Sequence, residues 1–547
     1  MFTLAKSEDL LDVRLLRMKR FSTHRAAPPL RQHRGVGVKT EVAKRARRWI
    51  LNGLCVATFL SMFGCAVGPE FVRPQPPPVD RYTHGTEPSA TVAAEGRAQH
   101  FETGANVPAD WWRLFNSPKL DTVIQGALTD NFSLQAAQAS LRESQDILRA
   151  GYGVFYPQID VNLGGARQKY SPARVGQNLP SSIFNLFTLS TTVSYALDVF
   201  GGERRAVESL KAQVDFQRYS VLATYLTLTG NVANAVIARA GYQAEIEATD
   251  EIIKAQQEQV GIAEAQVQAG TVPYSNLLAL ESQLAAYEAT LPALNQKLNQ
   301  TEHLLAVLSG RTPAEWETPE VALADLALPA NLPRTLPSEL VRQRPDILAA
   351  EAQLHASSAN IGVATAALFP SFSLNGSYGV NSNSTDNLFQ GGNSFWSLGA
   401  DITAPLFHGG SLSSRRQAAI EANRQSLASY RQTVLAAFAQ VADSLRALEH
   451  DAETVQAQSR SLIAADEALK LVQINYAAGV ASYLQVLVAN GQYYQAKIGY
   501  LQGVAQRYQD TVALFVALGG GWWNAENNTV GNLVPASRPL APEVENR

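Results

Sequence analysis

The sequence predicts an α+β membrane protein in which a few amphipathic strands are joined to very long helices. Three observations lead to this fold class. Two stretches of about 65 residues carry a helical pattern without proline, far longer than an ordinary globular helix. Two pairs of segments alternate apolar and polar side chains over about ten residues, as membrane β-strands do. The arrangement then recurs 209 residues later, which indicates an internal duplication.

A basic leader precedes the folded part. Residues 1–64 hold 13 Lys and Arg against 4 Asp and Glu, so a chain of net charge −3 keeps −12 on its body. The run Lys44–Arg48 precedes an apolar stretch of about 16 residues, which is the order of a secretory signal that starts at Met1 or Met18. The acidic body argues against nucleic acid as a partner.

Cysteine placement indicates a lipoprotein signal peptide. Cys55 lies inside the apolar stretch, and Cys65 follows it directly after Phe63-Gly64. This resembles a bacterial lipobox, whose cleavage leaves a terminal Cys for lipidation, for instance with palmitate; Met62 stands where Leu is usual. The alternative is an ordinary thiol. The sequence Ala66–Gly68, without Asp, favours the outer membrane.

A Pro-rich linker is predicted for residues 65–117. Five prolines lie between positions 69 and 78, and such composition forms an extended, semi-rigid tether. The tether leads from the lipid anchor to Trp111–Phe115, where the ordered body is expected to begin.

The first repeat is predicted to cover residues 118–309. Gly270 follows a long helical run, as suits a helix C-terminus that needs a left-handed residue. Pro292 is expected to kink or interrupt the last helix. The expected elements are a helix over 118–154, strands over 158–164 and 189–199, and helices over 203–269 and 274–308.

The second repeat is predicted to cover residues 338–523, after a connector over 310–337. It offers strands over 372–380 and 396–402, a Pro-free helix to Ala478, a turn at Gly479 and a helix to Leu518. The C-terminal tail, 524–547, is predicted to be disordered.

Four membrane-type strands cannot close a barrel alone. An open edge in a bilayer leaves backbone groups unpaired, at several kcal/mol each, so other copies of the chain must complete the sheet. Two, three or four copies would give 8, 12 or 16 strands, and only the larger counts leave an open lumen. The small polar side chains expected to face this lumen are Gln158, Asp160, Asn162, Ser190, Thr192, Ser194, Asp198, Ser373, Asn375 and Ser377.

Several motifs resemble those of the outer-membrane factors of tripartite efflux pumps, the TolC superfamily, and within it the OprM/NodT-type lipoproteins. The motifs are Cys65–Pro74, Arg344–Glu351, Phe369-Pro370, Ala478–Leu484 and Gly519–Trp522. The resemblance covers about residues 65–523. It implies a TolC-like homotrimer with a 12-stranded transmembrane β-barrel, four strands per chain, and a long periplasmic α-helical barrel.

The same resemblance implies the function and partners. We expect a passive outer-membrane conduit that exports drugs or other small molecules from the periplasm. Its implied partners are a periplasmic adaptor (membrane fusion) protein, an inner-membrane RND-type drug–proton pump and outer-membrane lipid. A conduit for type I protein secretion, or a non-conducting scaffold lipoprotein, are the alternatives.

The resemblance also implies sites at the far ends of the long helices. Adaptor docking is expected at two turns, Gly270, Thr271, Val272, Pro273 and Tyr274 in the first, and Gly479, Val480, Ala481, Ser482 and Tyr483 in the second. Just past the second turn the family often narrows the pore with Asp rings, but the matching positions here hold Gln485 and Val488.

An apolar gate is therefore the interpretation for this chain. Leu484 and Val488 would form a constriction that closes by dewetting, and wall packing is the alternative. Tyr476 matches a Tyr of the family's closed-state hydrogen-bond lock. An enzyme is not expected, because the sequence has no zinc-protease, nucleophile-elbow or phosphate-loop motif and no Cys/His cluster. No cofactor or metal is predicted.

Overall fold

The computed structural model describes residues 66–85, 87–94, 96–171 and 180–525. The chain divides into two units, Met1–Gly64 and Cys65–Arg547, and the account below concerns the second alone. The predictions for the leader, for lipidation of Cys65 and for nearly all of the tail lie outside the described residues.

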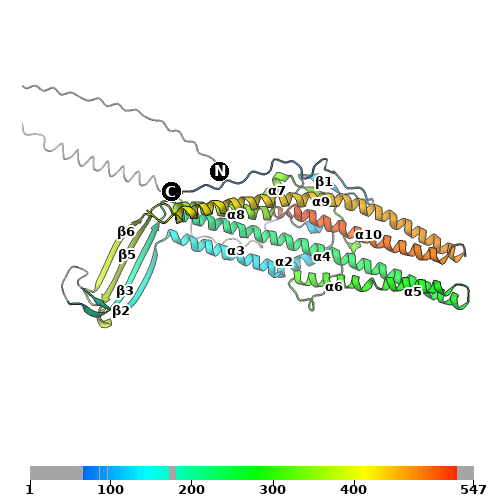
Figure 1. Cartoon of the computed structure of the whole chain (residues 1–547), viewed down its shortest axis with the longest axis horizontal. Coiled ribbons are helices and arrows are strands. Elements are labelled where there is room, and N and C mark those ends of the chain that lie inside the picture. The colour runs from blue at the N-terminus through cyan, green and yellow to red at the C-terminus, as the bar shows by residue number, and fades with distance from the viewer. Residues whose placement is uncertain (1–65, 86, 95, 172–179, 526–547) are drawn as a thin grey trace, which may run out of the picture. The chain divides into compact units, whose positions relative to one another are not determined.

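Four antiparallel strands form one sheet at one end of the helices (Figure 1). They are β2 (Gln158–Tyr170), β3 (Ser182–Leu197), β5 (Ser371–Ser382) and β6 (Ser394–Thr403), in the spatial order β2-β3-β5-β6. The four predicted strands are confirmed, although β2 and β3 are longer than expected. Pairing of β3 with β5 joins the two halves of the chain, and β2 and β6 are the outer edges.

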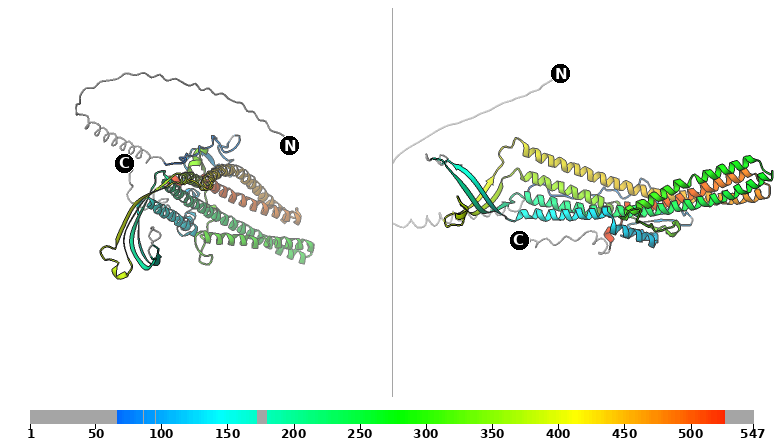
Figure 2. Two further views of the ribbon diagram at one scale, coloured as in Figure 1. Left: turned by 60° about the vertical axis from the view of Figure 1, so that its left-hand side comes forward. Right: turned by 90° about the horizontal axis from the view of Figure 1, so that it is seen from below.

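Two long helices dominate the rest. They are α4 (Gly202–Gln268) and α9 (Ser411–Ala477), each of 67 residues and so about 100 Å long. Each turns back into shorter helices, α5 (Tyr274–Glu288) and α6 (Leu291–Leu308) after α4, and α10 (Tyr483–Ala517) after α9. The two helical hairpins run side by side, away from the sheet (Figure 2). The predicted interruption at Pro292 is confirmed, because α5 ends at Glu288 and Pro292 lies in the first turn of α6.

The single helix predicted over 118–154 is wrong. The chain forms α2 (Pro118–Asp130), α3 (Phe132–Gly151) and a 3-10 turn, η3 (Tyr152–Phe155). Asn131 breaks the helix with an extended backbone, ψ 122°, and its side chain accepts a hydrogen bond from the Leu134 N–H at 3.0 Å. Asn favours such N-cap positions because its side chain satisfies a free helix donor.

The same break recurs 213 residues later. There Arg344, with ψ 126°, separates α7 (Pro337–Gln343) from α8 (Pro345–Ala366). Pro at the first helical position suits this start, since its missing N–H would have no partner there.

The predicted linker and connector both contain structure that sequence reasoning missed. Within them, β1 (His100–Thr103) pairs in parallel with β4 (Asn331–Arg334). Four-residue strands carry too little alternation to be recognised. The remaining short elements are 3-10 turns: η2 (Trp111–Phe115), η5 (Leu323–Asp325), η6 (Thr385–Asn387) and η7 (Trp522–Asn524).

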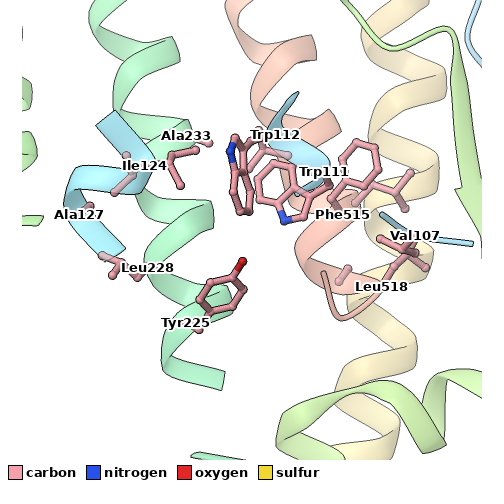
Figure 3. Packing of buried hydrophobic residues seen from close by; sticks show 14 of the residues in the cluster. Val107, Trp111, Trp112, Ile124, Ala127, Tyr225, Leu228, Ala233, Phe515 and Leu518 are labelled. Atoms are coloured by element: carbon pink, nitrogen blue, oxygen red, sulfur yellow. The ribbon is translucent and has the colours of Figure 1, made fainter. Parts of the chain in front are cut away.

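The main core forms where η2 packs on the long helices (Figure 3). Trp111 stacks on Phe515 of α10 at 5.4 Å between ring centroids, and Trp112 meets Tyr225 of α4 edge-on at 6.5 Å. Both tryptophans are fully buried, but the ordered body begins before them, since β1 starts at His100. Among the described helices, α4 is the one with an apolar stretch long enough to cross a membrane, and 67% of that stretch is buried inside the chain. It is therefore a core helix.

Candidate functional site at the helical turns

The first turn, between α4 and α5, depends on Gly270. Its φ of 70° lies in the left-handed region, which glycine adopts without strain. The Gly270 N–H donates to the Val267 carbonyl at 2.9 Å, and the Thr271 N–H donates to the Gln266 carbonyl at 3.0 Å. These two bonds form a Schellman motif, which satisfies carbonyls that the ending helix would leave free.

The second turn, between α9 and α10, repeats this geometry. Gly479 has a φ of 74°, and its N–H donates to the Tyr476 carbonyl at 2.9 Å. The Val480 N–H donates to the Asn475 carbonyl, also at 2.9 Å. The predicted role of glycine at both helix ends is confirmed.

Tyr476 ties the second hairpin to the first. Its hydroxyl donates to Gln266 Oε1 on α4 at 3.0 Å, and its ring meets that of Tyr483 edge-on at 6.0 Å. Burial raises the pKa of the Tyr483 hydroxyl to about 12, so it stays protonated at neutral pH. Sequence reasoning could not name the partner of Tyr476, because Gln266 is 210 residues away in the chain.

The start of α10 has one buried and one exposed face. Val486 and Ala489 are buried, whereas Leu484 and Val488 are 65% and 51% exposed. Residues four apart lie on one face of a helix, so these two side chains form a single apolar patch. Within the described part of the chain, more than half of each of these two side chains stays exposed.

Gln485 has a structural role that the sequence reasoning missed. Its Oε1 accepts a hydrogen bond from the Ser482 N–H at 2.9 Å, which caps the start of α10. The Ser-x-x-Gln spacing of a capping box was the available signal.

The predicted docking residues are presented mostly to the outside. Within the first turn Val272 is half-buried and the others are exposed, and in the second turn Ala481 and Tyr483 are half-buried. The two turns therefore present exposed residues at the ends of the hairpins, among them Tyr274 and Val480.

The sheet separates its two kinds of side chain, as predicted. Register places Asp160 opposite Thr192, and Thr192 opposite Ser377. The Ser377 and Ser397 hydroxyls lie 2.8 Å apart, and Asn162 Nδ2 donates to Thr192 Oγ1 at 3.2 Å. The other face carries exposed apolar side chains: Ile159, Val161, Leu163, Trp396, Leu398 and Ile402.

Asp198 does not belong to the polar face, contrary to the prediction. β3 ends at Leu197, and the Asp198 carboxylate instead accepts hydrogen bonds from the backbone N–H groups of Glu203 and Arg204, at 3.1 and 3.0 Å. A carboxylate at a helix N-terminus is favoured by the helix dipole, so Asp198 caps α4. In the described part of the chain, no group of three or more acidic, His or Cys side chains could hold a metal ion.

Comparison with known proteins now decides the family. The family model described as outer membrane efflux protein matches residues 123–311 and 336–520, which is most of both predicted repeats. The chain belongs to the outer membrane efflux protein family.

Relatives and solved structures agree over most of the chain. The pyoverdine export outer membrane protein OpmQ of Pseudomonas putida is 31% identical over 416 residues, covering 75% of this chain and 88% of its own. The probable efflux pump outer membrane protein TtgC of Pseudomonas putida is 29% identical over 479 residues, covering 86% and 96%. The outer-membrane channel OprN superposes with a TM-score of 0.75 at 27% identity, covering 84% of this chain and 100% of OprN.

This outer membrane efflux protein is thus an efflux channel of the outer membrane, with its helical part in the periplasm. The sheet is the part suited to the membrane, because one of its faces is apolar and exposed. The two turns lie at the opposite end of the helices from the sheet (Figure 1).

Proposed function

We propose that three copies of this chain close into one duct, with a 12-stranded barrel in the membrane and a helical barrel in the periplasm. The observation that carries this proposal is the four-stranded sheet, whose edge strands β2 and β6 pair with no other described strand. Unpaired backbone groups in a bilayer cost several kcal/mol each, so the edges need neighbours. Two copies would make an eight-stranded barrel filled by side chains, whereas three leave a water-filled lumen.

An internal duplication supplies the register of the closing strands. The long helices begin 209 residues apart and the entry strands 213 apart, at Gln158 and Ser371. Within the chain, Val193 on β3 pairs with Gly376 on β5. Applied to β6 and the next copy's β2, the same pairing places Ile402 opposite Leu163 of the partner subunit. Both side chains are apolar and exposed, and a slip of one residue would put Ile402 opposite Asn162 or Gly164 instead.

The gate of this duct is the apolar patch of Leu484 and Val488. Three such patches, one from each copy, would meet on the axis and exclude water without any charged ring. Residues 471–496 contain no charged side chain, which suits an uncharged constriction. The bond from Tyr476 to Gln266 would hold the two hairpins together in the closed state.

The proposed partners bind at the two ends of the folded structure, the helical turns and the sheet. The exposed turns at 270–274 and 479–483 would dock a periplasmic adaptor, which connects the duct to an inner-membrane RND-type pump. The lipid on Cys65 would anchor the membrane end, because the Val67 N–H donates to the Phe200 carbonyl at 3.0 Å and keeps this segment beside the end of β3. Small molecules would pass outward through the duct without chemical change.

Single-channel conductance of the purified protein in a planar bilayer tests this function, with the oligomer mass measured alongside. We expect discrete conductance steps from a species of three times the monomer mass. A double variant, Leu484→Ser with Val488→Ser, should open more often or more widely. A monomer that never conducts, with or without these substitutions, would leave a scaffold lipoprotein as the better account.

A further inference from the structure

A polar depression, called the trough below, runs along α4 and α10 beside the core cluster that contains Trp111 and Trp112. One cavity of about 570 Å³ lies between α4, α6 and α10, and a second of about 400 Å³ lies between α4, α9 and α10. The two share Asn231, Asn234 and Ala513, so they form one continuous depression. Its combined size suits a drug-sized molecule.

The trough opens away from the core. Successive residues of an α-helix turn by about 100°, which places Asn234 half a turn from Tyr225 on α4. Likewise Asp510 lies on the side of α10 opposite Tyr508 and Phe515. Tyr225, Tyr508 and Phe515 face the cluster of η2, whereas Asn234 and Asp510 line the trough. This inference rests on the duct proposed above and assigns the side away from that cluster to its lumen.

The lining is rich in hydrogen-bond acceptors and carries negative charge. Asp510 lines one cavity and Asp443 the other, and neither cavity is lined by Lys or Arg within the described residues. Asn231 and Asn234 line both cavities and add polar groups to the trough. The floor is apolar, with Ala235 and Leu304.

A third carboxyl lies behind Asp510. Asp451 on α9 reaches it, and burial, followed by that neighbour, raises the pKa of Asp451 to about 7. Asp451 Oδ2 is buried without a partner in the described part of the chain. The charged groups that act on Asp451 are Asp510 and Arg507, both on α10, and Arg507 opposes the shift. The negative charge beside the trough therefore grows as pH rises through neutrality.

We propose that this trough binds organic cations that carry an amine N–H on an apolar body, as a transit site in the pore wall. Asp510 would pair with the positive charge and accept the amine hydrogen, and Ala235 and Leu304 would contact the apolar part. Charge-assisted hydrogen bonds in a partly dehydrated groove are the strong ones, so such a site selects cations over neutral molecules.

The test measures binding of rhodamine 6G, a fluorescent organic cation, to the purified full-length protein by fluorescence anisotropy. We expect Asp510→Asn to weaken binding about tenfold, which is 1.4 kcal/mol. The matched control is Glu317→Gln, which removes the same charge from an exposed position on the connector and should leave the affinity unchanged. Binding should be tighter at pH 8 than at pH 6, and Asp451→Asn should abolish that difference.

Further measurements keep the inference open to refutation. Channel conductance is recorded on the same preparations, so that a wild type that conducts while Asp510→Asn binds the dye unchanged would overturn the site and spare the duct. If Asp510→Asn fails to assemble, thiol labelling of the variant Asn231→Cys tests the site instead. The label is specific because Cys65 is the only other cysteine outside the predicted signal peptide. A cationic thiol reagent should modify Cys at this position, and rhodamine 6G should protect it. A thiol that never reacts in the assembled protein would mean that a neighbouring copy fills the trough, against the proposal.

Discussion

The two long helices have the same length and opposite surroundings. Of the 67 residues in each, α4 has 27 buried and α9 has only 10. The contrast is sharpest at positions that correspond 209 residues apart. Leu226 is 9% exposed because it packs against Gly520, where there is no room even for a Cβ, whereas Leu435 is 61% exposed. The second half of the chain thus covers much of α4, whereas most of α9 stays uncovered by the described residues.

The difference in burial shows where one chain alone leaves apolar side chains exposed. In the proposed trimer, the cover that the exposed side of α9 lacks would come from a neighbouring copy. Substitutions at the two leucines should therefore have different consequences, one for folding and the other for assembly.

The largest effect is expected for Leu226→Glu. It would bury an unpaired carboxylate against the backbone at Gly520, a loss of more than about 4 kcal/mol by the usual cost of such groups. We expect little folded protein, measured as the yield of protease-resistant material in the membrane fraction. Normal yield would mean that α4 is not the core helix of the chain.

Leu435→Glu should spare the fold and break the oligomer. The charge would lie on a surface that is exposed in one chain, so helical circular dichroism should stay close to that of the wild type. The mass in detergent should fall from three copies to one. Leu435→Gln, which is polar but uncharged, serves as the graded control. A trimer of unchanged stability would show that this face of α9 is open to solvent.

The strand register gives the most specific test of how copies meet. Cysteines at Ile402 and Leu163 should form a disulfide between neighbouring copies, seen as a ladder of linked chains without reducing agent. Cysteines at Ile402 and Asn162 are the control, because side chains one residue apart point to opposite faces of a sheet. Linking of the control pair alone would place β6 one residue out of the proposed register.

The same comparison explains what the sequence could predict. The long helices, the glycine turns and the strand faces were predictable, because each follows from a local pattern: a missing proline, a Gly after a helical run, an alternation. The break at Asn131 was missed because the apolar periodicity continues across it, and only the side-chain cap reveals it. The partner of Tyr476 and the β1–β4 pairing depend on contacts between residues more than 200 positions apart. The capping role of Asp198 is local, but it was missed because the alternation of β3 continues in the sequence past Leu197, where the strand ends.

A smaller effect is expected where the two hairpins touch. Tyr476→Phe removes the hydrogen bond to Gln266, worth about 1 kcal/mol, and so should raise the open probability of the channel about fivefold. Tyr274→Phe in the first turn removes a hydroxyl from an exposed side chain and is the matched control. If the two variants gave the same conductance record, the hydroxyl of Tyr476 would have no role in keeping the channel closed.

The smallest effect is expected from two acidic side chains of the second hairpin that have no acidic counterpart in the first. Asp451 and Asp510 belong to the second hairpin, and the positions 209 residues earlier hold Tyr242 and Thr301. Burial, and then Asp510, raise the pKa of Asp451 to about 7. The folded state therefore binds this proton more tightly than the unfolded chain, so stability falls as pH rises from about 4 to about 7 and stays reduced above that.

Asp451→Asn should abolish this loss. Because the side chain is partly open to solvent, we expect a gain of only about 1 kcal/mol at pH 8, or about 1 °C in the unfolding midpoint of a chain this long, and no gain at pH 4. Thermal unfolding at both pH values measures it. An equal gain at pH 4 would mean that the substitution acts through packing, and the second hairpin would then carry no more electrostatic strain than the first.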